Sequence, residues 1–96
     1  MRSRSLSNPL RCEHVFRVLY SLKDGPKGLL EIQQETKISP AAFYNTVIPQ
    51  MLELGLIEES IEPGVRNVKK VVKMTEKGIR LYETLAQLRA AEVFLR

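Results

Sequence analysis

Residues 39–78 read SPAAFYNTVIPQMLELGLIEESIEPGVRNVKKVVKMTEKG, and they hold two helix signals with a hairpin signal between them. Ser39-Pro40 predicts the start of a helix, because serine accepts hydrogen bonds from free backbone N–H groups and proline fits the first helical turn. Gly55 predicts the end of that helix, since glycine readily adopts the left-handed conformation that closes one. Between these points, apolar residues at helical spacing predict a buried face that comprises Phe43, Val47, Met51 and Leu54, widened by Tyr44, Ile48 and Leu52.

The hairpin signal consists of two segments rich in β-branched residues, 56–62 and 68–74. They flank a turn that contains Pro63-Gly64, and a turn of this length leaves the register of the hairpin open. Thr75 with Glu76 then predicts the start of a long helix that ends at about Leu95.

Two shorter helices are predicted before residue 39. Asn8-Pro9 indicates the start of the first, which we expect to end near Lys23, where residues 24–26 (Asp-Gly-Pro) break it. The second covers residues 29–36, and Ile38 fills the gap between it and the next helix. The inward-facing residues of this second helix are Leu29, Leu30 and Ile32.

Length and charge limit the classes of protein that the chain can belong to. The 96 residues fit one domain. A net charge of +4 and a pI near 9.5 favour polyanionic partners. No apolar run is long enough to span a membrane, and no apolar segment follows Arg2 and Arg4 to form a signal peptide. We therefore expect a cytoplasmic protein of a prokaryote, or of a virus inside its host cell, with no membrane partner.

The order and spacing of these signals resemble those of the winged helix-turn-helix regulators of bacteria and archaea, in the broad MarR/PadR-like sense. The matching segments are residues 38–40, 51–57 and 74–78, and the resemblance covers roughly Val15 to Leu88. It implies an α+β fold, a winged helix-turn-helix with three helices, a two-stranded β wing and a long C-terminal helix. In such families the third helix enters the major groove, the wing touches the backbone or minor groove, and the last helix pairs two subunits.

The long last helix is also similar to that of small archaeal winged-helix proteins that dimerise through a coiled coil. We therefore expect three parts. These are a flexible basic N-terminal tail at residues 1–8, a winged-helix DNA-binding domain at 9–78 and a C-terminal dimerisation helix at 79–96.

Pro49 departs from the family pattern because it lies inside the third helix. It removes a backbone donor and clashes with the carbonyl of Asn45. The segment from Ile38 to Gly55 is also one residue longer than the usual family spacing. We therefore predict a bend between Asn45 and Pro49, formed by a kink or by a single-turn π-bulge. The extra residue leaves open whether the side chain of residue 43 or that of residue 44 faces the core.

The outer face of the third helix carries the residues that we expect to contact DNA. Ser39 can bond a phosphate, and Ala41 and Ala42 are small enough to let the helix approach base edges. Asn45 can pair with both hydrogen-bonding groups of an adenine edge, and Thr46 can reach a phosphate or a base. The alternative is a solvated polar face. Because this face has no Arg or Lys, we expect it to favour A·T-rich sites.

The wing carries a basic cluster in which Arg66, Lys69 and Lys70 can neutralise phosphates, while strand alternation can turn Lys73 away. The alternative is a solvated edge whose lysines block pairing with other strands. The first strand carries three acids, which predict that it lies on the side away from DNA; they are Glu58, Glu59 and Glu62.

The last helix carries more apolar residues than the core of so small a domain needs. We expect one seam to pair two copies of the chain, and its residues are Leu81, Leu85, Leu88 and Val93. Three others are expected to face the domain body: Ile79, Tyr82 and Ala86. The alternative is that both faces pack on the first helix of the same subunit.

Cys12 and His14 are the only cysteine and histidine, so the sequence predicts no metal site and no disulfide. No catalytic motif or cofactor-binding loop is present, and we expect no enzyme activity. The expected function is a sequence-specific double-stranded DNA-binding transcriptional regulator that acts as a homodimer. Three alternatives remain open: a protein–protein interaction module, a non-specific architectural or replication-associated DNA binder, and a sensor of an unknown small-molecule effector.

Overall fold

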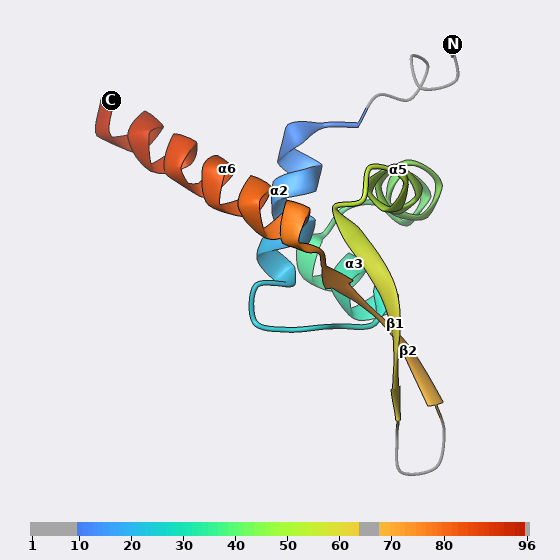
Figure 1. The fold of residues 1–96 in the computed structure, drawn as a ribbon. Helices are drawn as coiled ribbons and strands as arrows, with labels where there is room; N and C mark the ends of the chain where they lie inside the picture. The colour runs from blue at the N-terminus through green and yellow to red at the C-terminus, as the bar shows by residue number, and fades with distance from the viewer. Residues whose placement is uncertain (1–9, 64–67, 96) are drawn as a thin grey trace.

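The computed structural model describes residues 10–63 and 68–95. A helical body is formed by α2 (Cys12–Ser21), α3 (Leu29–Thr36) and a third, composite helix. The hairpin of β1 (Ile57–Pro63) and β2 (Val68–Met74) projects from this body, and α6 (Glu76–Leu95) crosses α2 and continues past it (Figure 1). The expected α+β arrangement of three helices, a two-stranded sheet and a long last helix is confirmed. The predicted N-terminal tail at 1–8 and the turn residue Arg66 lie outside the described residues.

The first helix is shorter than predicted. Leu10 and Arg11 are not helical, and Arg11 holds extended backbone angles with no side-chain cap, so the helix begins at Cys12. The prediction of one continuous helix from Pro9 is therefore wrong, and Pro9 itself lies outside the described residues. At its C-terminal end the helix stops at Ser21, two residues before the predicted point.

The helix-turn-helix follows the predicted boundaries. After α3, Lys37 adopts a left-handed conformation with φ of +60°, and Ile38 is 2% exposed beneath the turn. Ser39 then caps the next helix, because its Oγ accepts a hydrogen bond from the N–H of Ala42 at 3.3 Å. The prediction that Leu30 faces inward is wrong, since 61% of this residue is exposed.

The third helix contains the irregularity that Pro49 predicts. It is made of α4 (Pro40–Ala42), the π-helical turn η1 (Phe43–Val47) and α5 (Ile48–Glu53). The N–H of Ile48 donates to the carbonyl of Phe43, five residues back, instead of four. Since Pro49 has no N–H, it cannot form the α-helical bond to the carbonyl of residue 45, and the π-turn takes up the extra residue. The π-bulge alternative is confirmed.

The π-turn changes which residues face inward. One additional residue in a turn shifts everything after it by about 100° around the helix axis. Leu54, predicted to face inward, is therefore 49% exposed. Ile48, Met51 and Leu52 lie inward as predicted. Before the shift, Phe43 is fully buried and Tyr44 is 42% exposed, so the prediction that Tyr44 widens the buried face is wrong.

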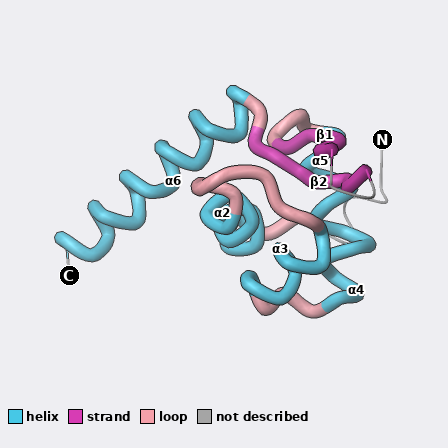
Figure 2. Tube along the Cα trace, turned by 90° about the horizontal axis from the view of Figure 1, so that it is seen from below, coloured by secondary structure: helices cyan, strands magenta, loops and turns pink. Residues whose placement is uncertain are grey.

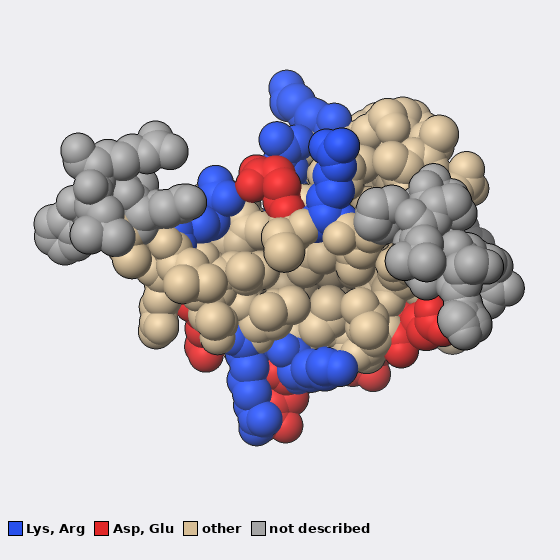
Figure 3. Space-filling model, turned by 90° about the horizontal axis from the view of Figure 1, so that it is seen from above, with Lys and Arg blue, Asp and Glu red and all other residues tan. Residues whose placement is uncertain are grey.

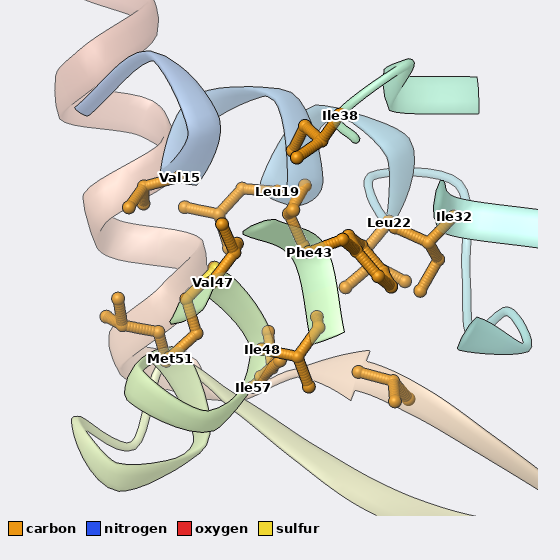
Figure 4. Packing of buried hydrophobic residues seen from close by; sticks show 13 residues of the cluster. Val15, Leu19, Leu22, Ile32, Ile38, Phe43, Val47, Ile48, Met51 and Ile57 are labelled. Carbon is orange, nitrogen blue, oxygen red and sulfur yellow. The ribbon is translucent and has the colours of Figure 1, made fainter. Parts of the chain in front are cut away.

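The core lies where α2, α3 and the third helix meet the base of the hairpin. Phe43 lies at the centre of the buried cluster, among side chains from all three helices (Figure 4). The buried cluster comprises Val15, Val18, Leu19, Leu22, Ile32, Ile38, Phe43, Val47, Ile48, Met51, Leu56, Ile57 and Val72. It is continuous, so the described residues of the body form one packed unit.

The two strands pair antiparallel from Ile57 opposite Met74 to Pro63 opposite Val68. The predicted hairpin is therefore confirmed, and its turn lies outside the described residues. On the other side of β2, Lys27 exchanges backbone hydrogen bonds of 3.0 and 2.8 Å with Val72. This bridge ties the hairpin to the connection between α2 and α3.

The last helix packs against the body with a face that agrees only in part with the predicted one: Tyr82 faces the body as predicted, and Ala86 is half-buried. Leu81, Tyr82 and Leu85 all pack against the buried core, whereas Ile79 is 43% exposed. The placement of Ile79 on the body is therefore wrong, while Leu81 and Leu85, predicted for the dimer seam, are half-buried against their own subunit. The side chain of Val93 lies outside what the structure describes. The C-terminal half of α6 extends beyond α2 (Figure 2). No helix among residues 10–63 and 68–95 is long and apolar enough to cross a membrane.

Candidate nucleic-acid interface

Four of the five third-helix residues predicted to contact DNA lie on residues 40–53, which we name the recognition segment, and the fifth, Ser39, is the N-cap before it. Positions four residues apart along it form an outward row opposite the buried face. All four members of this row are exposed, and they are Ala41, Asn45, Pro49 and Glu53. The structure thus brings together Ala41 and Asn45, two of the five predicted contacts, one turn apart on the exposed side.

The other three predicted contacts are less free. Ser39 is exposed, but its Oγ already accepts the N-cap bond described above, so only its hydroxyl proton remains for a phosphate. Thr46 is half-buried. Ala42 is also half-buried and packs against the core, which leaves Ala41 as the small residue at the surface.

Asn45 is the polar group of the outward row best placed to read a base. Its side chain is exposed and, within the described part of the chain, makes no hydrogen bond. The backbone under it belongs to the π-turn and is held by the burial of Phe43 and Val47 on the opposite side. A free amide on a fixed backbone is the group that pairs with an adenine edge.

Charge is sparse on the recognition segment, which contains Glu53 and no Lys or Arg. Lys37, two residues before the helix cap, is exposed in the turn that precedes the segment. Sequence reasoning missed this residue, although a basic side chain in the turn of a helix-turn-helix could have indicated it. On the side opposite the hairpin tip, Lys and Arg lie at the edges beside acids, with uncharged residues between them (Figure 3).

The wing is less basic than the sequence predicted. The Nζ of Lys70 lies 3.7 Å from a carboxylate oxygen of Glu59, and that of Lys73 lies 3.9 Å from one of Glu58. The register sets Glu58 directly opposite Lys73 on one face of the hairpin, and it places Glu59 and Lys70 as diagonal neighbours on the other face. The basic run predicted on the second strand therefore has acids of the first strand beside it, and which strand lies nearer DNA stays a prediction. The backbone of Lys69 pairs with Glu62, but its side chain, like Arg66, lies outside what the structure describes.

On the far side of α2, a charged hollow of about 430 Å³ lies between α2, the end of α3 and α6. Glu13 receives hydrogen bonds there from Arg89 at 2.9 Å and from Arg17 at 3.3 Å. The bond from Arg89 is the main cause that holds the pKa of Glu13 below its usual value, and Arg17 adds to it. Glu13 therefore forms ion pairs with both arginines, and its pair with Arg89 links α6 to α2.

The described residues contain no candidate metal-binding site. Cys12 is exposed and His14 half-buried on α2, and no group of three His, Cys, Asp or Glu side chains there could hold a metal ion.

Solved structures share this architecture. A mutant of ZitR from Lactococcus lactis superimposes with a TM-score of 0.71 and 21% identity, over 91% of this chain and 57% of that one. The reduced form of the transcriptional regulator YodB from B. subtilis gives a TM-score of 0.67 and 21% identity, over 92% of this chain and 84% of that one. The MarR family transcriptional regulator SPO1453 from Silicibacter pomeroyi DSS-3 gives a TM-score of 0.66 and 23% identity, over 97% of this chain and 65% of that one.

The chain has a winged-helix fold. It spans less than two thirds of the ZitR and SPO1453 chains. The sequence itself matches no protein-family model and no curated protein. YodB and SPO1453 are described as transcriptional regulators.

Proposed function

We propose that this winged helix is a sequence-specific, double-stranded DNA-binding transcriptional regulator that acts as a homodimer. The recognition segment enters the major groove, and the hairpin contacts the backbone or minor groove. The observation that carries the proposal is the outward row, where Ala41 and an unpaired Asn45 stand opposite a fully buried face. A protein with this function must reach genomic DNA, so we place it in the cytoplasm of a prokaryote or, for a viral protein, inside the infected host cell.

Sequence reading rests on Asn45. An asparagine that pairs with an adenine edge discriminates against other bases by about 1–3 kcal/mol. The small side chain of Ala41, one turn earlier, lets the helix backbone come close to the bases, and an alanine methyl can touch a thymine methyl. Glu53, at the other end of the row, repels phosphates, so the N-terminal half of the segment lies deeper in the groove.

Affinity rests on cations outside the recognition segment. Lys37 before the helix cap and Lys70 and Lys73 on the hairpin are exposed and can reach phosphates. Each phosphate that the protein neutralises lowers the logarithm of the binding constant by about 0.9 per tenfold rise in salt. Because the two hairpin lysines lie close to glutamates, we expect a modest salt slope.

The homodimer rests on α6. Its C-terminal half extends beyond the body (Figure 1). Leu88 there is 60% exposed, and it borders a hollow lined by Cys12, Phe16 and Leu85 together with the charged Glu13 and Arg89. A second copy of α6 would cover this surface and place two recognition segments on one face of DNA. The matching site is a near-palindrome whose half-sites lie about 34 Å apart.

Selection of bound duplexes from a random pool tests DNA reading directly. We expect enrichment of an A·T-rich near-palindrome and, against the selected duplex, a loss of about 1–3 kcal/mol for Asn45→Ala. The matched control is Gln87→Ala, which truncates an exposed amide on α6 and should bind like the wild type. Equal losses on selected and random duplexes would reject base reading by Asn45.

Sedimentation at micromolar concentration tests the homodimer. Leu88→Glu places a charge in the exposed apolar surface and should shift the particle towards the 11.0 kDa monomer. Gln87→Glu adds the same charge at the neighbouring exposed position and should leave the dimer intact. A monomeric wild type would remove the dimer from the proposal.

Two other functions remain as outcomes of the same selection. The glutamates beside the hairpin lysines, together with the lack of cations on the recognition segment, favour a protein-interaction module as the second candidate. Such a module would bind no duplex even at low salt. Tight binding without any enriched sequence would instead identify an architectural or replication-associated DNA binder.

A further inference from the structure

The start of α6 is hydrogen-bonded to the backbone of residues 54–56, which directly follow the recognition segment. The hydroxyl of Thr75 donates to the carbonyl of Gly55 and accepts from the N–H of Gly78 at 3.1 Å. The N–H of Thr75 donates to the carbonyl of Leu56 at 3.1 Å. One threonine thus caps α6 and also binds the two residues that follow Leu54 at the end of the third helix.

Gly78 lets the two segments touch. A Cβ placed on it would lie 2.0 Å from the carbonyl oxygen of Leu56, far closer than real Cβ atoms come to any neighbour. The backbone of α6 therefore lies directly against that of residue 56. Lys77 adds a second attachment, since its Nζ donates to the carbonyl of Leu54 at 2.7 Å, where an ammonium also suits the C-terminal end of a helix.

These contacts join residues about twenty positions apart in the chain, on either side of the hairpin. Further along α6, the exposed ion pair of Arg89 with Glu13 and the apolar packing on α2 also hold the helix against the body. An exposed ion pair holds a helix angle weakly. The angle between α6 and the recognition segment is therefore set by the contacts at the first turn of α6 together with the apolar packing of Leu81, Tyr82 and Leu85 on the body.

We propose that Thr75, Lys77 and Gly78 form a rigid joint that fixes the angle between α6 and the recognition segment, and so determines which half-site spacing the dimer accepts. This inference rests on the proposed function, because it requires α6 to pair two copies and the recognition segment to read DNA. The three are positioning residues that act through the backbone of residues 54–56. With α6 as the shared element of the dimer, a rigid joint holds two recognition segments at one separation.

Thr75→Val tests the joint, because valine keeps the shape of threonine and removes both side-chain hydrogen bonds. Thr75→Ser keeps both bonds and is the matched control. Duplexes carrying the selected half-sites at a series of spacings are measured with each protein. We expect the wild type and Thr75→Ser to prefer the best spacing over its neighbours by about tenfold, and Thr75→Val to lose most of that preference. Because the readout is a ratio between duplexes, a smaller folded fraction does not change it.

A measurement without DNA checks the same joint. Spin labels are attached at Ala41→Cys and Gln87→Cys in a Cys12→Ser background, with excess unlabelled chain so that each dimer carries one labelled copy. The distance distribution between the labels should be narrow with threonine or serine at position 75 and broader or shifted with valine. An unchanged distribution together with an unchanged spacing preference in Thr75→Val would overturn the joint.

The two proposals fail in different ways. A wild type that binds no duplex removes the DNA-binding proposal, yet the distance distribution still decides whether the joint is rigid. A wild type that binds a palindrome but tolerates every spacing equally overturns the joint and leaves the DNA-binding proposal standing.

Discussion

Truncating Phe43 and Tyr44 separately tests the π-turn in the third helix. Phe43 is fully buried, and removing a buried phenylalanine side chain costs about 3–5 kcal/mol of unfolding free energy. Tyr44 is 42% exposed, and its ring meets Phe43 edge-on at 4.9 Å between centroids. Such an aromatic pair contributes about 0.5–1.5 kcal/mol, so we expect Tyr44→Ala to cost roughly that amount.

Urea unfolding followed by circular dichroism measures both changes. Because a domain of this size has a total stability of about 5–15 kcal/mol, Phe43→Ala can leave it close to unfolding, and Phe43→Leu provides a milder second variant. We expect Phe43→Leu to cost at least as much as Tyr44→Ala, and Phe43→Ala to cost several times more. If Tyr44→Ala were the more damaging of the two alanine substitutions, residue 44 would face the core and the assigned position of the π-turn would be wrong.

Two further predictions concern charge. Glu59→Gln removes the acid 3.7 Å from Lys70, and we expect the affinity for duplex DNA at low salt to rise by about two- to fivefold. High salt should abolish this gain. The matched change Glu83→Gln, at an exposed position on α6, should not produce it. Hydrogen bonds from Lys27 and from a serine hydroxyl, 2.7 Å each, hold the pKa of Glu35 below its usual 4.5. A carboxyl whose pKa is lower in the folded than in the unfolded state stabilises the fold at pH values above its unfolded pKa. That stabilisation is lost as the pH falls through its folded pKa. The urea midpoint of the wild type should therefore exceed that of Glu35→Gln at neutral pH and converge with it as pH falls below about 4.5, whereas a pH-independent difference would contradict this role.

The boundaries of the elements could be predicted because the signals that set them are local. Ser39 caps the third helix, Gly55 closes it with φ of +74°, and Thr75 caps α6, each as its residue type predicts. The π-turn could also be predicted, since a proline without an N–H and one surplus residue leave few ways to continue a helix.

The candidate site could be predicted only in part. Ala41 and Asn45 reach the surface as the helical spacing indicated, but Thr46 is half-buried and Ala42 packs against the core. The pairs of Glu59 with Lys70 and of residues 58 and 73 depend on the register of the hairpin. A turn of several residues does not specify that register, so the sequence showed a basic run where the structure has alternating charges.

For this protein, the sequence by itself determined where each helix and strand lies in residues 29–95, because caps, prolines and glycines act on the backbone next to them. Only the tertiary structure decided which faces are used. Packing leaves Tyr44 and Leu54 exposed, the crossing with α2 places Leu81 and Leu85 against the core, and the hairpin register sets acids beside lysines. Which face of an element is buried depends on packing against residues that are distant in the chain, and this packing moves all side chains of the element together. A local sequence pattern therefore does not predict it.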